Sequence, residues 1–429
     1  MRNIMRCASL MIVVSAAPGT VAAQEVPADR DAALRMFLDC PNFFCDLDFY
    51  RREISFVSYV RDRQDADVHV LIATQATGGG REHTLNFIGL RDFEGIETTL
   101  VYNSSATDTP DETRNGLARV IKFGLMRYVA ESSVADQIDI NFRADRPEQA
   151  REPVEDRWNY WVFTISANGT VNIQARNKFY NGFGSVTANR TTEDWKFNIR
   201  VNGSYNESRF ELDDGSDIVS TRESYGTNGL LVRSLGDHWG AGVIASVNRA
   251  SFTNIDLRFR FTPAVEYNIF PYSESSSRQL TFRYAAGINA VNYEQETLFG
   301  KFSETLAEHS LTGALSFTQP WGSSSISLTG LQFLNDLSKN RLTLFANTNI
   351  RLVRGLSLRL FGVASRVRDQ LFLPKAGATD EEVLLRRRQL ETSFTYFVSA
   401  GFTYRFGSIF NNIVNPRFGG AGGGEGFFF

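Results

Sequence analysis

The stretch that decides the fold is Phe394–Phe406, which reads FTYFVSAGFTYRF. Its even-numbered positions are all apolar or aromatic, whereas the odd-numbered ones are mostly small or polar, with Phe397 as the exception. Alternation with a period of two predicts a β-strand that has one apolar and one polar face. The question is whether the apolar face borders a soluble core or lipid.

The same period continues almost without interruption from about Trp158. It is clearest in Asp194–Tyr205, Ile255–Phe270, Gln279–Ala290 and Arg341–Leu352. Strands of a soluble sandwich alternate too, but these run to about ten residues or more, which matches a tilted membrane crossing. Short and long connections also alternate, as the periplasmic turns and outer loops of outer-membrane barrels do.

We therefore predict a transmembrane antiparallel β-barrel of about 12 strands over residues 158–406. In this interpretation the apolar positions of Phe394–Phe406 face lipid, and the strand closes the barrel so that no edge is left in hydrocarbon. Trp195, Trp239 and Trp321 fall at short turns, where an aromatic girdle at the inner membrane interface is expected. The predicted strands start near Thr170, Phe183, Asp194, Arg222, Trp239, Ile255, Arg278, Thr305, Ser323, Asn340, Gly355 and Leu390.

Residues 1–23 read as a secretory signal peptide. Arg2 and Arg6 supply the positive charge, and the apolar stretch Leu10–Ala17 is too short to span a bilayer. The small residues Val21–Ala23 suit a cleavage site. The formal net charge of −3 gives no sign of a nucleic-acid partner.

Residues 24–152 have a mixed pattern that predicts a small periplasmic α+β domain with the order β-α-β-β-β-α-β. The clearest helix begins after Thr109, where Pro110 and Glu112 complete a capping box. The first helix would carry Phe49, Ile54, Val57 and Val60, and the last strand would be Gln137–Phe142. This order, with ADVHVLI after a helix and TPDE before the second, loosely resembles the amino-terminal domain of TolB or the CsgG secretion family.

The quoted stretch itself resembles the C-terminal β-signal of outer-membrane barrels, through Phe402, Tyr404 and Phe406 in GFTYRF. That resemblance implies an outer-membrane location, contact with outer-membrane lipid and recognition by the barrel assembly machinery. The usual signal ends its chain, but here the Gly/Phe-rich tail 407–429 follows. The tail is either a flexible periplasmic segment or a tethered end that docks on a partner or on the chain's own domain.

Cations gather on the alternate positions that should face the lumen, with few acids among them, chiefly Asp256 and Glu266. They indicate either a lumen that favours anions or charge pairing inside a closed or plugged barrel. By parity, the inward cations are Arg176, Lys178, Lys196, Arg200, Arg258, Arg260, Arg283, Arg341, Arg351, Arg359 and Arg405.

Residues for catalysis are sparse. His309 lies within a predicted strand, but Ser310 points to the opposite face, so a His/Ser pair on one face is missing there. The glycine-rich TGGGRE joins two strands and reads as a hairpin turn rather than a phosphate cradle. Cys40 and Cys45 are either a disulfide or two reduced thiols, and a single pair is poor support for zinc. We expect no enzyme, no cofactor and no metal site.

The sequence thus predicts an outer-membrane β-barrel that acts as a channel, a transporter or an envelope-assembly component. Its N-terminal domain would lie in the periplasm and could bind a periplasmic protein partner. The alternative is a non-conducting structural barrel whose periplasmic domain anchors envelope partners.

Overall fold

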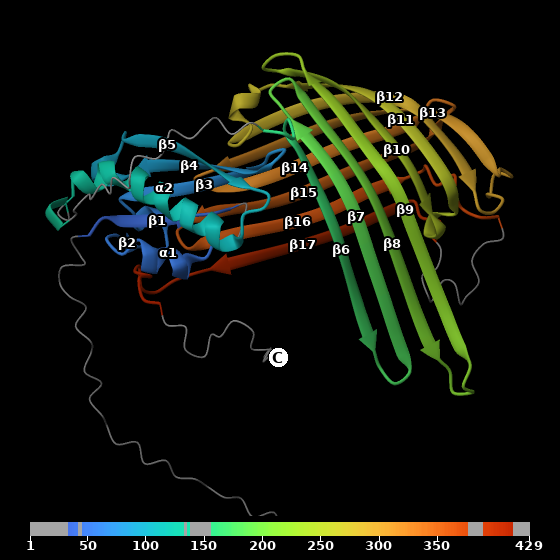
Figure 1. Cartoon of the computed structure of the whole chain (residues 1–429), viewed down its shortest axis with the longest axis horizontal. Coiled ribbons are helices and arrows are strands. Elements are labelled where there is room, and N and C mark those ends of the chain that lie inside the picture. Colours follow the sequence, from blue (N-terminus) through green and yellow to red (C-terminus); the bar gives the residue numbers. More distant parts are fainter. Residues whose placement is uncertain (1–32, 42–44, 133–134, 138–155, 376–388, 415–429) are drawn as a thin grey trace, which may run out of the picture.

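The computed structural model describes residues 33–41, 45–132, 135–137, 156–375 and 389–414. The predicted signal peptide, residues 138–142 of the expected last strand of the domain, and the Phe-rich chain end lie outside these residues. The described residues form a five-stranded sheet with two α-helices and a twelve-stranded sheet (Figure 1). Neither helix is long and apolar enough to span a bilayer.

The N-terminal domain is an α+β layer structure, as predicted. Its sheet has the order β2-β1-β3-β4-β5, in which β1 runs parallel to β2 and β3, and β3, β4 and β5 are antiparallel neighbours. One detail of the prediction was wrong: α1 ends at Glu53, and the next residues form the short edge strand β2 instead of further helix. The elements are β1 (Arg35–Asp39), α1 (Leu47–Glu53), β2 (Ser58–Tyr59), β3 (Val68–Ala76), β4 (Gly80–Gly89), β5 (Glu97–Ser105) and α2 (Pro110–Ala130).

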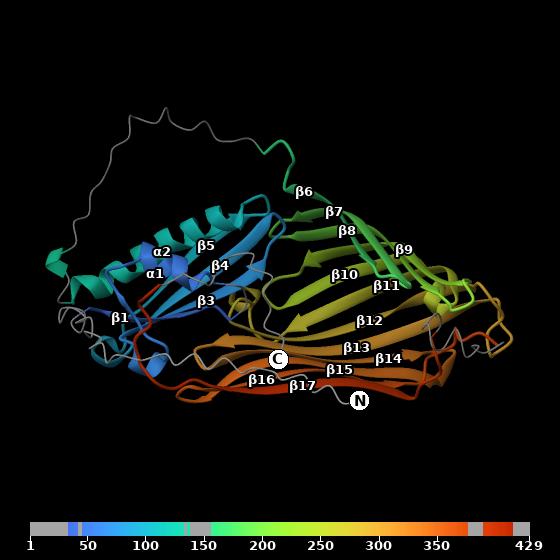
Figure 2. The same cartoon turned by 90° about the horizontal axis from the view of Figure 1, so that it is seen from below.

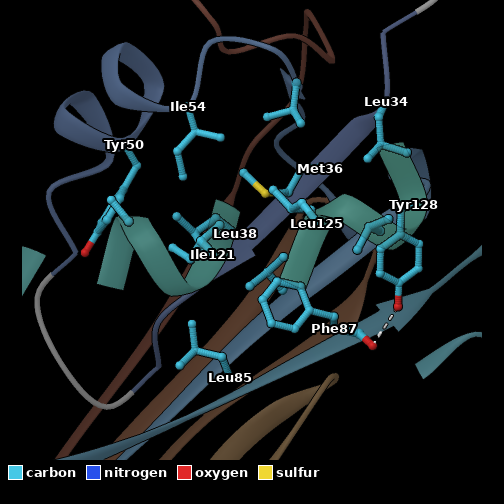
Figure 3. Close-up of a cluster of buried hydrophobic side chains, with 14 of the residues drawn as sticks. Leu34, Met36, Leu38, Tyr50, Ile54, Leu85, Phe87, Ile121, Leu125 and Tyr128 are labelled. Atoms are coloured by element: carbon cyan, nitrogen blue, oxygen red, sulfur yellow. Dashed lines mark hydrogen bonds between the residues drawn. The ribbon is translucent and has the colours of Figure 1, made fainter. Parts of the chain in front are cut away.

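The apolar stripe of α2 packs on one face of this sheet and builds the core (Figure 3). Thr109 caps α2 by accepting from the backbone N–H of Glu112, whose carboxylate accepts from the Thr109 N–H, so the predicted capping box is present. Near its other end, the Tyr128 hydroxyl donates to the carbonyl oxygen of Phe87, 3.0 Å away. Buried packing and a capped start therefore fix α2 on the sheet.

The large sheet contains the twelve strands that the period-two pattern predicts. Neighbours in sequence are neighbours in the sheet, and every pair is antiparallel. The first strand begins earlier than expected, at Trp161 rather than near Thr170. The strands are β6 (Trp161–Ile173), β7 (Asn177–Thr191), β8 (Trp195–Glu211), β9 (Asp217–Ser234), β10 (Trp239–Ala250), β11 (Ile255–Asn268), β12 (Arg278–Tyr293), β13 (Ser303–Gln319), β14 (Gly322–Phe333), β15 (Asp336–Val353), β16 (Leu356–Val367) and β17 (Phe394–Tyr404).

The two outermost strands differ from the sequence prediction. In the described residues β6 pairs only with β7 and β17 pairs only with β16, so the expected closing contact between β6 and β17 is not formed. Figure 2 shows β6 and β17 at opposite edges of the curved sheet. The quoted stretch therefore forms the last strand of the sheet, but its second edge is open.

The strand register defines two faces of the large sheet, because residues directly opposite each other on antiparallel strands share a face. The row Ser323, Asn349, Arg359 and Gly401 lies on what we call the polar face. The row Leu358 and Phe402 lies on the apolar face. The apolar face carries large exposed side chains across the sheet, including Ile199, Val247, Phe259, Phe282, Leu311, Leu344 and Tyr404.

The strands are longer, and several connections shorter, than predicted. Only Leu212–Ser216 separates β8 from β9. The longest connection, between β16 and β17, covers residues 368–393, of which 376–388 lie outside the described residues. Trp195 and Trp239 begin strands, and Trp321 lies in the β13–β14 turn. All three lie at the same end of the sheet, where the β7–β8, β9–β10, β13–β14 and β15–β16 turns are found, and we call it the short-turn end.

Candidate functional site at the junction of the two sheets

The N-terminal domain lies at the short-turn end of the large sheet (Figures 1 and 2). It contacts this end at three separated places. They are the β15–β16 turn, the β11–β12 connection, and the end of the β6–β7 pair. The domain therefore spans from one side of the curved sheet to the other.

The most buried of these contacts is an ion pair at the end of β1. Arg351 donates through both terminal nitrogens to Asp39, at 2.8 Å and 2.7 Å. His69 Nε2 lies 3.2 Å from the same carboxylate, and it must be the donor because an ionised carboxylate only accepts. The Asp39 side chain is only 8 % exposed and the Arg351 side chain 29 %. The Arg351 guanidinium also stacks over the Phe37 ring, 4.9 Å from its centre.

The electrostatics of Asp39 and His69 follow from this geometry. Burial acts to raise the pKa of Asp39, but the hydrogen bonds from His69 and Arg351, together with the positive charge of Arg351, outweigh it and hold the pKa below 3.8. Burial lowers the pKa of His69 below 6.5, against the opposing effect of Asp39. At neutral pH the contact is thus an ionised Asp39 between a neutral imidazole and Arg351.

A second ion pair lies beside the first and is more exposed. Arg354 donates through one nitrogen to both oxygens of Asp65, at 2.6 Å and 2.7 Å. Its side chain is 54 % exposed. Next to it, the Gly355 N–H donates to Asp62 at 2.8 Å. The β15–β16 turn is therefore held by three carboxylates of the domain.

The other two contacts lie across the sheet from these. Ser275 in the β11–β12 connection donates to the Gln75 side chain at 3.2 Å. The glycine-rich turn between β3 and β4, predicted as a hairpin turn, comes so close to β7 that a Cβ on Gly78 would lie 2.6 Å from the Thr191 Cβ. Glycine at this position permits the approach of the two backbones.

The segment after β17 extends the N-terminal sheet. Arg61 N–H donates to the Ile409 carbonyl at 3.1 Å, and Asn411 N–H donates to the Tyr59 carbonyl at 2.8 Å. Val60 and Phe410 form an antiparallel bridge. The Asn412 side chain accepts from the Tyr59 N–H, so the tail acts as an added strand at the open edge of β2. Residues 409–412 thus dock on the chain's own domain, whereas the Phe-rich end for which docking is predicted lies outside the described residues.

A cavity of about 510 Å³ lies between the domain and the polar face of β14–β17. Five arginines and three aspartates line it: Arg61, Arg351, Arg354, Arg359, Arg405, Asp39, Asp62 and Asp65. Arg359 and Arg405 have no ion-pair or hydrogen-bond partner for their side chains within the described part of the chain. Arg61 donates to the Phe406 carbonyl at 3.0 Å, but its buried Nε atom has no partner in the same residues.

The register places most of the predicted lumen cations on one face. Lys196, Arg200, Arg258, Arg260, Arg283, Arg341, Arg351 and Arg359 all share the polar face. Arg405 follows β17 and lines the cavity. From β8 onward the strand cations of the prediction therefore share one face, and that this face lines a lumen stays a prediction.

Two of the predicted inward cations lie elsewhere. Lys178 pairs in register with Arg209 on the apolar face, because Phe179 and Phe183 of β7 occupy the polar face instead. Phe179 packs edge-on against Phe210, and these polar-face aromatics reverse the parity inferred from β7. Arg176 lies in the β6–β7 turn, where it forms an ion pair with Asp213.

The acids of the polar face also differ from the prediction. Asp256 sits at a bulge where β11 and β12 lose register, and it forms an ion pair with Arg249 at 3.1 Å. Glu266 is on the polar face, directly opposite Arg283. Sequence reasoning missed Glu308, which is 2 % exposed, forms an ion pair with Arg260 and accepts from Asn289 at 3.1 Å. Glu308 and Ser310 are the two neighbours of His309 in β13, so the alternation places both on the polar face and His309 on the apolar face.

The first residues of the β16–β17 connection fold back over the polar face. Asp369 forms an ion pair with Arg341 at 2.9 Å, and Phe372 packs on the buried cluster of Ile255, Val291 and Tyr293. Leu373 accepts from the Leu298 N–H at 2.8 Å. This segment thus lies over the polar face at the end of the sheet where β16 is connected to β17, while the N-terminal domain lies at the opposite end.

The remaining candidate residues have structural partners. Cys40 and Cys45 form a disulfide. His309 lies on the apolar face between Tyr284 and Gln332, at 3.3 Å and 3.1 Å. In the described residues we find no group of three or more side chains of the kinds that bind metals.

No family model and no curated protein matches the chain. Among solved structures, the NanC porin is similar over 57 % of this chain and 99 % of its own, at 9 % identity and a TM-score of 0.27. The translocator domain of the autotransporter NalP from Neisseria meningitidis is similar over 70 % of this chain and 100 % of its own, at 13 % identity and a TM-score of 0.23. At such TM-scores the likeness carries no argument about this chain.

Proposed function

We propose that this chain is an outer-membrane β-barrel protein of the channel or transporter class, with its N-terminal domain held over the periplasmic end. One observation carries the proposal: the apolar face of the twelve-stranded sheet is exposed and continuous. Phe259 and Phe261 on β11 are each 40 % exposed, and Phe282 and Tyr284 on the neighbouring β12 are each 46 % exposed. A surface of this size would be costly in water but is the normal exterior of a sheet in lipid.

Strand length supports the same placement. The strands have 11 to 18 residues. A tilted transmembrane strand needs roughly 9–11 residues, so each is long enough to cross the hydrocarbon. The polar face, with its arginines and glutamates, would then line the interior.

In lipid the open edges of β6 and β17 must find partners, because unpaired backbone groups are too costly in hydrocarbon. We infer that these two strands pair with each other in the membrane and close the barrel. Single cysteines scanned along β6 should cross-link with a cysteine at Val398 in membrane-inserted protein. Cysteines at Leu358 and Phe402, which are opposite each other in the structure, serve as the positive control. If the control cross-links and no β6 position does, closure by these strands is wrong.

The location follows from the signal peptide and from the β-signal-like Phe402, Tyr404 and Phe406. Contact with outer-membrane lipid, recognition by the barrel assembly machinery and a periplasmic protein partner for the N-terminal domain belong to the same proposal. We propose no catalytic activity, no cofactor and no nucleic-acid partner. The mature protein should fractionate with the outer membrane and migrate differently on gels before and after heating. Recovery as a soluble periplasmic protein would contradict the proposal.

The alternative is a non-conducting structural barrel whose N-terminal domain anchors envelope partners. One observation favours it: the domain spans one end of the sheet, and the Asp369–Leu373 segment lies over the polar face at the other. Planar-bilayer recording of the full chain and of a chain lacking residues 24–152 separates the two functions. Conductance that appears or increases on deletion indicates a gated channel, whereas no conductance in either protein indicates the structural role.

A further inference from the structure

We propose that the cavity between the N-terminal domain and the polar face binds a small polyhydroxylated anion, through a carboxylate or phosphate group. The inference deepens the proposed function, because it names a ligand class for a protein whose lumen is expected to favour anions. The site is built by both parts of the chain. Arg61 comes from the domain, Arg359 from β16, and Arg405 from the segment that follows β17.

The charge balance of the cavity is the first argument. Asp39 neutralises Arg351 and Asp65 neutralises Arg354, each in a direct ion pair. Asp62 accepts from the backbone N–H groups of Gly355 and Gln64. Arg61, Arg359 and Arg405 are left facing one cavity without a carboxylate partner in the described residues. Like charges that share a cavity repel, and an anion between them would turn that repulsion into attraction.

The chemistry of the lining is the second argument. Guanidinium groups bind carboxylates and phosphates through paired hydrogen bonds. Arg359 lies in one register row with Asn349 and Ser323. The adjacent row, one step further into the sheet, holds Asn347 and Ser325, and these residues line an adjoining cavity of about 500 Å³. Amide and hydroxyl groups beside an arginine suit a ligand whose charged group is surrounded by hydroxyls.

The position of the cavity gives binding a consequence. Because Arg61 belongs to the domain whereas Arg359 and Arg405 belong to the large sheet, an anion that contacts both would strengthen docking. By linkage, tighter docking would in turn raise the affinity for the anion. Ligand binding and retention of the N-terminal domain at the mouth are therefore coupled.

The test is equilibrium binding to the purified full-length protein in detergent at low salt. The probes are inorganic phosphate, glucose 6-phosphate, glucuronate and uncharged glucose. We expect saturable binding of glucose 6-phosphate, glucuronate or both, little binding of glucose, and weaker binding as salt rises. Whether the phosphate or the carboxylate probe binds more tightly identifies the charged group. The doubly substituted R359Q/R405Q protein should bind about tenfold more weakly or worse, given the strength of charge-assisted hydrogen bonds.

The matched control is Arg200→Gln, which removes a polar-face cation on β8 away from the cavity. Its affinity for the anions should equal that of the wild type. Equal weakening by R200Q and by R359Q/R405Q would overturn the site in favour of a diffuse positive lumen. Equal binding of glucose, or no saturable binding of any anion, would overturn it as well.

A second readout follows docking and keeps the site distinct from the proposed function. The binding anion should slow hydrogen exchange at the Gly355 amide, which hydrogen-bonds to Asp62 across the junction, and should not do so in R359Q/R405Q. Binding without conductance would leave the site standing and remove the channel. Conductance without binding would do the reverse.

Discussion

The contact of Arg351 with Asp39 should hold most of the docking energy of the N-terminal domain. Arg351→Ala leaves a carboxylate that is 8 % exposed with only His69 as a side-chain partner. Removing one member of a buried pair costs about 3–5 kcal/mol, since the other charge stays desolvated. The lower end of that range applies because His69 remains, so we expect a loss of about 3 kcal/mol in docking free energy, or about a hundredfold in the docking equilibrium.

The matched comparison is Arg354→Ala, three residues further along the chain. Its partner Asp65 has only 11 % of its side chain exposed, but Arg354 itself is 54 % exposed, so water can take its place beside the carboxylate. Because water can solvate Asp65 once Arg354 is removed, we expect a smaller loss than for Arg351→Ala, about 1–2 kcal/mol, which corresponds to a change of about five- to thirtyfold. The assay is hydrogen exchange at the Gly355 amide, because its hydrogen bond to Asp62 joins the large sheet to the N-terminal domain and breaks when the junction opens. Similar acceleration in the two variants, or a larger effect of Arg354→Ala, would refute the view that burial sets the strength of this junction.

The remaining predictions concern separate parts of the chain. Acidification should destabilise the N-terminal domain, because burial holds the pKa of His69 in the folded protein below its unfolded value of 6.5. As the pH falls below 6.5, the unfolded state therefore binds more protons and is favoured. Thermal melts from pH 7.5 to 5.5 should show a falling melting temperature. Gly78→Ala should accelerate exchange at the junction, whereas Gly79→Ala should not, because a Cβ on Gly79 meets only Val162 at an ordinary 3.7 Å. Phe402→Asp or Tyr404→Asp should impair assembly more than Thr403→Asp, because Thr403 lies on the polar face. A charge on the lipid face is costly: about 2–4 kcal/mol for arginine or lysine at the bilayer midplane, and less for acids. The yield of the heat-modifiable form measures the assembly defect. If the barrel conducts, replacing Lys196 and Arg200 with Gln should shift the reversal potential toward cations, while Lys178→Gln on the apolar face should leave it unchanged.

The sheet could be predicted from the sequence because its signal is local. Each strand shows its own alternation, so the number of strands and the face of most residues follow without knowing any long-range contact. The capping box of α2 is equally local, since Thr109 and Glu112 lie three residues apart. Where the local signal was ambiguous, the prediction was wrong. Lys178 was predicted to face inward, but the register puts its neighbour Phe179, and also Phe183, on the polar face and Lys178 on the apolar one.

Phe397 shows the same ambiguity within the opening stretch. It is the odd position that breaks the alternation, and in the structure it lies on the polar face, where its ring packs 5.9 Å from that of Phe361. Phe361 packs in turn against Phe345 on β15. Phe397 therefore contacts an aromatic residue of the neighbouring strand, and the sequence of one strand alone cannot show such a contact.

The candidate site could not be predicted because its residues are distant in sequence. Asp39 and Arg351 are 312 positions apart, and Asp62 and Gly355 are 293 apart. Nothing in the alternation distinguishes Arg351, which is neutralised by Asp39, from Arg359 on the next strand, which has no such partner in the described residues. Parity gives the face of a cation, but only the fold shows whether a carboxylate reaches it.

The tail explains why the chain continues past Phe406. In a barrel the last strand must leave its free edge for the first, so the chain cannot continue along that edge without blocking closure. Here residues 409–412 turn to β2 instead, which brings the segment after β17 back to the N-terminal domain. Because β2 is a short edge strand, its unpaired backbone groups are a ready partner for such a segment. The tail thus covers an edge of the N-terminal sheet and leaves the edge of β17 open. Since the tail follows directly after β17, it also fixes the domain beside the β15–β16 turn, where Arg351 and Arg354 meet their aspartates.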